Sequence, residues 1–177
     1  MVLQQTSRME NIVNDLLSLS RIELQEHIRP NEKVNLNDII SHSIELHQEI
    51  LKKNNIECQF ERESKNVKIN GDRNRLIEVF NNLIDNGIKY SEKNKKITIT
   101  TKSGHKNFLV TIKDQGIGIS KENIPQVTER FFRVDPAKSK EVGGTGLGLA
   151  IVKHIVNQHR AETVSYTHLT LPTTVRV

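Results

Sequence analysis

Apolar side chains along roughly the first 26 residues recur at a spacing close to a heptad, with polar residues between them. The positions of this apolar seam are Val2, Met9, Ile12, Leu16 and Leu19, and the positions that widen it are Val13 and Leu17. The spacing predicts one amphipathic helix whose apolar face needs a partner, either a partner helix or the rest of the same domain. Since no capping residue precedes this helix, we expect the helical region to begin upstream.

Residues 28–34 are the predicted linker, because Pro30 cannot donate the backbone hydrogen bond that a helix requires. A second domain is expected over residues 35–162. Asn35 or Asn37 can cap a helix that runs to about residue 55. The side chains expected on the inner face of that helix are Leu36, Ile39, Ile40, Ser43, Leu46, Ile50 and Leu51.

Alternating apolar residues and turn residues predict the remaining elements of this domain. The predicted elements are strands at 56–61 and 67–70, a helix from about 73 to 89, a hairpin of 97–101 and 108–112 with its turn at 104–107, a short helix at 121–132, a polar loop at 134–145 and a helix from 146 to about 160. Hairpins mixed with helices indicate an α+β fold, a two-layer sandwich with a mixed sheet and the helices on one face.

Composition narrows the class of protein. The chain is 35% hydrophobic and 27% charged, as in ordinary soluble domains, and no apolar run approaches the ~20 residues of a membrane-spanning helix. The net charge is +5, but the basic residues are scattered and aromatic residues make up only 4%, which argues against nucleic acid as a partner. The single cysteine, Cys58, alternates with Ile56 and Phe60 on one strand face, so we expect a buried thiol.

Two glycine clusters follow the predicted hairpin. Asp114-Gln-Gly116-Ile-Gly118 places one carboxylate beside backbone that can approach a flat ring closely. Residues 143–149, Gly-Gly-Thr-Gly-Leu-Gly-Leu, lead into a helix whose free N–H groups and dipole favour phosphate. Alone, the first cluster could be a simple turn at a strand end; together, the two predict the walls of an ATP site.

Asn82 and Asn86 lie one helical turn apart upstream, so both amides project from one helix face. Such a pair alone is more often a solvated face. With both glycine clusters in this order, residues 35–162 resemble the ATP-binding domain of a two-component sensor histidine kinase, which has the Bergerat fold. Residues 7–23 resemble the second helix of that family's dimerisation hairpin, so residues 1–27 are expected to be an incomplete hairpin. The amino-acid sequence of these motifs most resembles that of kinases that sense phosphate limitation.

The resemblance assigns roles on the helix and the first glycine cluster. Asn86 would bind Mg²⁺ and Asn82 would assist through water or phosphate. Lys89 would meet phosphate oxygens, and the ring of Tyr90 would pack on the adenine. Asp114 would accept a hydrogen bond from the exocyclic amine of adenine, where guanine presents a carbonyl oxygen. The backbone at Gly116 and Gly118 would pass under the purine.

The resemblance also assigns the second wall. Phe131, Phe132 and Arg133 match the family's Phe box, which packs the near edge of an ATP lid at residues 134–145. The residues expected to cradle the β and γ phosphates are Gly144, Thr145, Gly146, Leu147 and Gly148, with Lys138 and Lys140 as further candidates for phosphate contacts. The sequence departs from the family at Gly87, which is usually Ala, and at Thr128, which is usually aromatic.

The implied reaction is transfer of the ATP γ-phosphoryl group to a histidine and then to an aspartate of a response regulator. None of the seven histidines lies in the family's acceptor pattern, so we expect the acceptor upstream and expect this chain to bind ATP without completing autophosphorylation. The implied cofactors are ATP and Mg²⁺. The implied partners are a second copy of the chain, bound through the helical hairpin, and the receiver domain of a response regulator. We expect no membrane contact by this chain. The full-length protein would be anchored in the membrane, with this domain on the cytoplasmic side.

Residues 163–177 lack the glycines that the family carries in its last strands. We therefore expect this tail to be foreign sequence, and the sheet to lack strands and to expose its edges.

Two rival hypotheses remain from the sequence. An ATPase of the gyrase, chaperone or mismatch-repair type shares the fold and places a general base one turn before the asparagine, a spacing that Glu78 and Asn82 also have. An adaptor that only dimerises through residues 1–26 would have no need for the glycine clusters.

Overall fold

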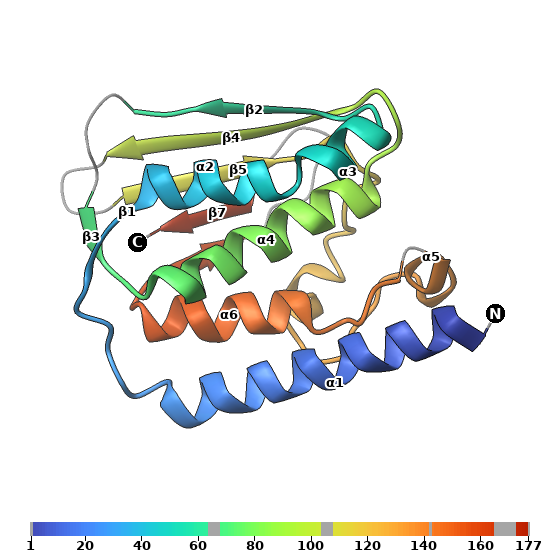
Figure 1. Cartoon of the computed structure of the whole chain (residues 1–177), viewed down its shortest axis with the longest axis horizontal. Helices are drawn as coiled ribbons and strands as arrows, with labels where there is room; N and C mark the ends of the chain where they lie inside the picture. Colours follow the sequence, from blue (N-terminus) through green and yellow to red (C-terminus); the bar gives the residue numbers. More distant parts are fainter. Residues whose placement is uncertain (1, 64–67, 104–107, 142, 165–172, 177) are drawn as a thin grey trace.

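The computed structural model describes residues 2–63, 68–103, 108–141, 143–164 and 173–176 (Figure 1). The helices are α1 Val2–Gln25, α2 Leu36–Leu46, α3 Gln48–Lys53, α4 Arg73–Tyr90, α5 Pro136–Glu141 and α6 Gly148–Gln158, with a 3₁₀ turn at Ile124–Gln126. The strands are β1 Lys33–Asn35, β2 Glu57–Glu61, β3 Lys68–Asn70, β4 Lys96–Ser103, β5 Phe108–Lys113, β6 Glu162–Val164 and β7 Thr173–Arg176. Over the described ranges, no helix is long and apolar enough to cross a membrane.

The main sheet has the strand order β2-β4-β5-β7-β6, in which only β2 and β4 run parallel. Figure 1 shows α2, α4 and α6 over one face of this sheet, and α1 lies against α6 on the side away from the strands. The predicted α+β sandwich with a mixed sheet, preceded by one long helix, is confirmed.

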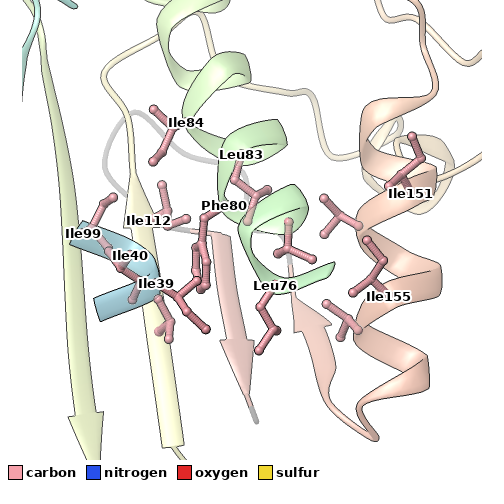
Figure 2. Close-up of a cluster of buried hydrophobic side chains, with 14 of the residues drawn as sticks. Ile39, Ile40, Leu76, Phe80, Leu83, Ile84, Ile99, Ile112, Ile151 and Ile155 are labelled. Atoms are coloured by element: carbon pink, nitrogen blue, oxygen red, sulfur yellow. The ribbon is translucent and has the colours of Figure 1, made fainter. Parts of the chain in front are cut away.

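The core lies between α4 and the sheet. Apolar side chains at helical spacing make α4 amphipathic, and Asp72 caps it by accepting hydrogen bonds from the N–H groups of Asn74 and Arg75. Figure 2 shows this inner face packed against α2, α6 and the strands. The labelled core residues are Ile39, Ile40, Leu76, Phe80, Leu83, Ile84, Ile99, Ile112, Ile151 and Ile155. Cys58 packs at the edge of this core, and burial raises the pKa of its thiol to about 11.

The tail takes part in the sheet. Strands β6 and β7 pair antiparallel with each other, and β7 pairs with β5 so that Val110 lies opposite Val175. The prediction that the sheet lacks strands after residue 162 is therefore wrong, because a ladder is made by backbone groups and does not require the family's glycines. That the tail is foreign sequence stays a prediction.

Other local predictions differ from the structure. The last residues of the predicted linker, Lys33 and Val34, belong to β1, which pairs with β3. The helix that Asn35 caps breaks at His47, whose Nδ1 lies 2.8 Å from the Ser43 carbonyl oxygen. Two side chains expected on the inner face are exposed, Leu46 by 57% and Ile50 by 40%, whereas Leu51 is buried as expected.

The predicted short helix at 121–132 is instead a 3₁₀ turn followed by irregular backbone, in which Phe131 has a φ of +62°. The loop predicted at 134–145 contains α5. The turn predicted at 104–107 lies outside the described residues.

Candidate nucleotide site

A cavity of about 340 Å³ lies between α4, the loop that leads into α6, and α1. It brings together ten of the residues predicted for the site: Asn82, Asn86, Lys89, Tyr90, Phe132, Arg133, Gly144, Thr145, Gly146 and Gly148. Four predicted residues are not in its lining: Asp114, Gly116, Gly118 and Leu147. The lining that sequence reasoning missed is Asn11, Asn14, Asp15, Asp85 and Val127, whereas Gly143 and Leu149 belong to the glycine cluster predicted as one wall.

The asparagine face of α4 meets the first turn of α6. The Nδ2 of Asn82 donates to the Glu78 carbonyl oxygen at 2.9 Å, which turns its Oδ1 toward Gly148. A Cβ at Gly148 would lie 2.6 Å from that oxygen, closer than any real contact. A side chain at the start of α6 would therefore displace the Asn82 amide from its position in the cavity wall.

Two charged residues of α4 line the cavity. Lys89 Nζ lies 2.5 Å from Asp85 Oδ2, one helical turn away, and both residues line the cavity. A lysine beside a carboxylate is still a mobile point charge that can turn to a phosphate oxygen. Asp85 escaped the sequence reasoning because an acid and a lysine at this spacing are typical of a solvated helix face.

The glycine loop and the Phe box hold one another in place. The N–H of Phe131 donates to the Gly146 carbonyl oxygen at 2.8 Å, and Arg133 donates from Nη2 to the Thr145 carbonyl oxygen at 2.9 Å. Gly146 has a φ of +77°, and a Cβ there would lie 3.0 Å from the Phe131 backbone. A side chain at this position would be both strained and crowded, so Gly146 fixes the path of the loop.

The segment predicted to be the lid contacts the end of α4 through Ser139. The hydroxyl groups of Tyr90 and Ser139 lie 3.2 Å apart, and the N–H of Gly144 donates to the Ser139 carbonyl oxygen at 2.8 Å. Ser139 is buried. The side chains of Lys138 and Lys140 lie outside the described part of the chain, so their predicted phosphate contacts stay predictions.

Asp114 lies beside the cavity. Its Oδ1 accepts from the Gly116 N–H at 2.8 Å, and a Cβ at Gly87 would lie 3.7 Å from its Cβ. The N–H of Ile117 donates to the Tyr90 carbonyl oxygen at 3.2 Å. The loop that begins at Asp114 is thus held against the last turn of α4, next to Asn86 and Tyr90, and its exposed carboxylate is open to a ligand that extends from the cavity.

Glu78 occupies a different place from the one a general base requires. It accepts a hydrogen bond from Ser18 Oγ at 2.6 Å and pairs with Arg75 at 3.0 Å, and it is not part of the cavity lining. The pairing with α1 disfavours the ATPase in which Glu78 activates water.

Residues 71–177 match the family model described as histidine kinase-, DNA gyrase B-, and HSP90-like ATPase, which is more than half of the chain. The chain belongs to this ATPase family. The match covers both glycine clusters and the asparagine helix, and it extends through the tail.

Named relatives of this ATPase domain are sensor kinases. The chain is 35% identical over 158 residues to the sensor-like histidine kinase SenX3 of Mycobacterium tuberculosis, covering 89% of this chain and 38% of that protein. It is 34% identical to the phosphate regulon sensor protein PhoR of Pseudomonas aeruginosa, covering 89% and 35% respectively, in agreement with the predicted similarity to phosphate sensors. The chain therefore spans little more than a third of the length of these relatives.

The fold of the ATPase domain is also that of a solved kinase. The Acinetobacter baumannii histidine kinase AdeS superposes with a TM-score of 0.79 at 25% identity, over 99% of this chain and 80% of that one. The superposition includes α1, so the long helix and the ATPase domain occur together in that protein as well.

Proposed function

We propose that this chain is the catalytic domain of a sensor histidine kinase, which binds ATP with Mg²⁺ and presents the γ-phosphoryl group to a histidine for relay to a response-regulator aspartate. The observation that carries the proposal is the cavity itself, where the amides of Asn82 and Asn86 face the glycine loop that opens α6. A helix that presents hydrogen-bonding side chains opposite a helix N-terminus with free N–H groups suits a triphosphate.

The residues present fit a magnesium ion. Asn86 and Asp85 both line the cavity, and oxygen ligands of this kind suit a hard cation that also takes phosphate oxygens. When bound, Mg²⁺ would neutralise charge on the phosphates during transfer. In this proposal Asn86 holds the ion, Lys89 leaves Asp85 to pair with a phosphate oxygen, and Arg133 steadies the loop through the Thr145 carbonyl.

Base selectivity is assigned to the Asp114 loop. Its carboxylate, held by the Gly116 N–H beside the end of α4, would accept a hydrogen bond from the amine of adenine. Guanine would set a carbonyl oxygen against this carboxylate and leave both acceptors unpaired.

The proposal includes the partners of a kinase of this type. On α1, the exposed apolar side chains of Met9, Val13 and Leu17 support pairing with another helix, as in a dimerisation hairpin. The receiver domain of a response regulator and a membrane-anchored parent with this domain on its cytoplasmic side belong to the same proposal.

A fluorescent ATP analogue titrated into the unmutated chain tests the function. We expect saturable binding of the analogue that requires Mg²⁺. Unlabelled ATP should displace the analogue, and GTP should not. Because a hydrogen bond to a charged group is lost, Asp114→Asn should weaken binding at least about tenfold, and Asn86→Ala should remove most of the Mg²⁺ dependence. Asn157→Ala, an exposed amide on α6, is the matched control and should bind as the unmutated chain does. Absence of saturable binding would overturn the proposal.

A further inference from the structure

An acidic side chain from α1 reaches the loop that is proposed to hold phosphate. Asp15 lines the cavity, and its Oδ2 accepts a hydrogen bond from the Thr145 hydroxyl at 2.7 Å. These two residues are 130 positions apart in the sequence, and Asp15 lies outside the part of the chain that matches the ATPase family. The contact therefore joins the long helix directly to the nucleotide site.

The contact is placed at the start of α6. Thr145 Oγ1 also lies 3.3 Å from the Leu147 N–H, which donates to it, and Leu147 is the N-cap residue of α6. The free N–H groups and the dipole of a helix N-terminus attract negative charge. Its hydrogen bond with the Thr145 hydroxyl holds the Asp15 carboxylate beside this helix N-terminus. In the proposed function, a phosphate oxygen would bind in the same region.

The rest of the same helix face holds Asp15 in this position. Leu19 and Ile22, one and two turns further along α1, are 1% and 0% exposed. Ser18 donates to Glu78 on α4 at 2.6 Å. Spacings of three, four and seven residues put all four side chains on one stripe. When this stripe packs on α4 and α6, Asp15 therefore enters the cavity in the same step.

The negative charge of Asp15 is only partly balanced by its surroundings. Burial raises the pKa of Asp15, and the neighbouring acids Glu78 and Asp85 raise it further, whereas the hydrogen bond from Thr145 and the charge of Lys89 lower it. Lys89 itself is engaged by Asp85. Phosphate groups brought into the same cavity would add negative charge beside this carboxylate.

We propose that Asp15 is a residue of the nucleotide site that competes with the phosphate groups, so that docking of α1 and binding of the triphosphate oppose one another. This inference rests on the proposed function. It predicts that the cost of the Asp15 charge grows with the number of phosphates on the ligand, because each phosphate adds charge near the carboxylate. The nucleoside alone should be indifferent to Asp15.

The test compares Asp15→Asn with the unmutated chain for Mg²⁺·ATP, ADP and adenosine by isothermal titration. Asparagine keeps an oxygen for the Thr145 hydroxyl and removes the charge. We expect ATP to bind about tenfold tighter to the variant, ADP about threefold tighter and adenosine unchanged, as the electrostatic term falls with ligand charge. Glu10→Gln, which removes one charge from the exposed face of α1, should change none of the three affinities.

Hydrogen exchange of the α1 amides gives an independent readout. Saturating ATP should speed exchange over residues 15–25 in the unmutated chain, because the docked stripe is released. Equal or weaker ATP binding by Asp15→Asn would overturn the inference and leave the ATP site standing. A lack of saturable ATP binding by every variant, Asp15→Asn included, would instead remove the proposed function and the inference with it.

Discussion

The two faces of α4 and α6 are built differently. Toward the sheet they present a continuous apolar surface, in which Leu76, Phe80 and Ile155 interlock with isoleucines of the strands and of α2 (Figure 2). Toward α1 the buried aliphatic contact is supplied by Leu19 and Ile22, and polar contacts complete it. The polar contacts of α1 and the residues that follow it include Asp15 with Thr145, Ser18 with Glu78, Glu23 with His154 and with Arg130 of a nearby loop, Glu26 with His154, and the backbone carbonyls of residues 25 and 28 with the Gln158 amide.

This difference separates a permanent interface from one that can open. Separating the sheet face would expose a large apolar area at about 25 cal/mol per Å², whereas most polar contacts of α1 would exchange protein partners for water at a net cost of about 1 kcal/mol each. The cavity lies where the two interfaces meet. We therefore expect the walls on α4 and α6 to stay in place and the wall on α1 to be the one that moves.

The largest effect is expected inside the sheet face. Phe80 is fully buried at the centre of the core, so Phe80→Ala should lower the free energy of unfolding by about 3–5 kcal/mol, through the lost transfer energy and the cavity left behind. Urea unfolding followed by circular dichroism measures this. Phe131→Ala removes a ring that is half exposed and should cost less than about 1 kcal/mol. Equal losses at the two positions would contradict the placement of the core at the sheet face of α4.

A smaller effect is expected from the α1 interface. Ile22→Ala removes a fully buried side chain, but its cost is limited to the free energy of docking α1, which we expect to fall by about 1–2 kcal/mol while the core stays folded. Hydrogen exchange should then accelerate in α1 about tenfold and remain unchanged in α4. Leu24→Ala, at an exposed position of the same helix, should leave both rates unchanged. Acceleration in α4 as well would show that α1 and the core unfold together.

Local patterns were sufficient for the parts of the fold whose causes are local. The apolar spacing over residues 76–84 lies within α4, and alternation within 97–112 marks the hairpin. The break at His47 could not be read in this way, since the residues around it keep a helical pattern. Likewise, Phe131 takes its positive φ where its N–H bonds Gly146, a contact between distant segments that no local propensity encodes.

The residues of the candidate site also fall into those set by local sequence and those set by contacts between distant segments. Asn82 and Asn86 were predictable because a single helix fixes their relation, and the glycine loop because its composition is unusual. Asp15 was missed because a single acidic residue in an amphipathic helix is normally solvated, even when apolar residues lie one turn away. Its position depends on how α1 docks, and docking rests on pairs such as Ser18 and Glu78, which are 60 residues apart.

Acidification should move the two interfaces in opposite directions, and this is the smallest of the expected effects. His159 joins α6 to the cap of α4, with Nε2 accepting the Asp72 N–H at 3.0 Å and Nδ1 donating to the Ile155 carbonyl oxygen. Burial and the Arg29 charge lower its pKa, against the Ile155 hydrogen bond and the Asp72 charge, which raise it. Its stabilising contribution is therefore present above the ordinary histidine value of 6.5 and is lost as the pH falls through the lowered pKa.

Asp15 has the reverse sign, because its raised pKa means that docking favours the protonated carboxyl; its contribution is present below the ordinary value of 3.8 and is lost as the pH rises through the raised pKa. Between neutral pH and about pH 5, urea stability of the core should fall while protection of α1 against hydrogen exchange, corrected for intrinsic rates, should hold or rise. His159→Gln should flatten the first profile only, and Asp15→Asn the second only. If both profiles fell together and neither variant changed them, α1 would be part of the permanent core, because its docking would then follow the stability of the sheet face instead of the charge at the cavity.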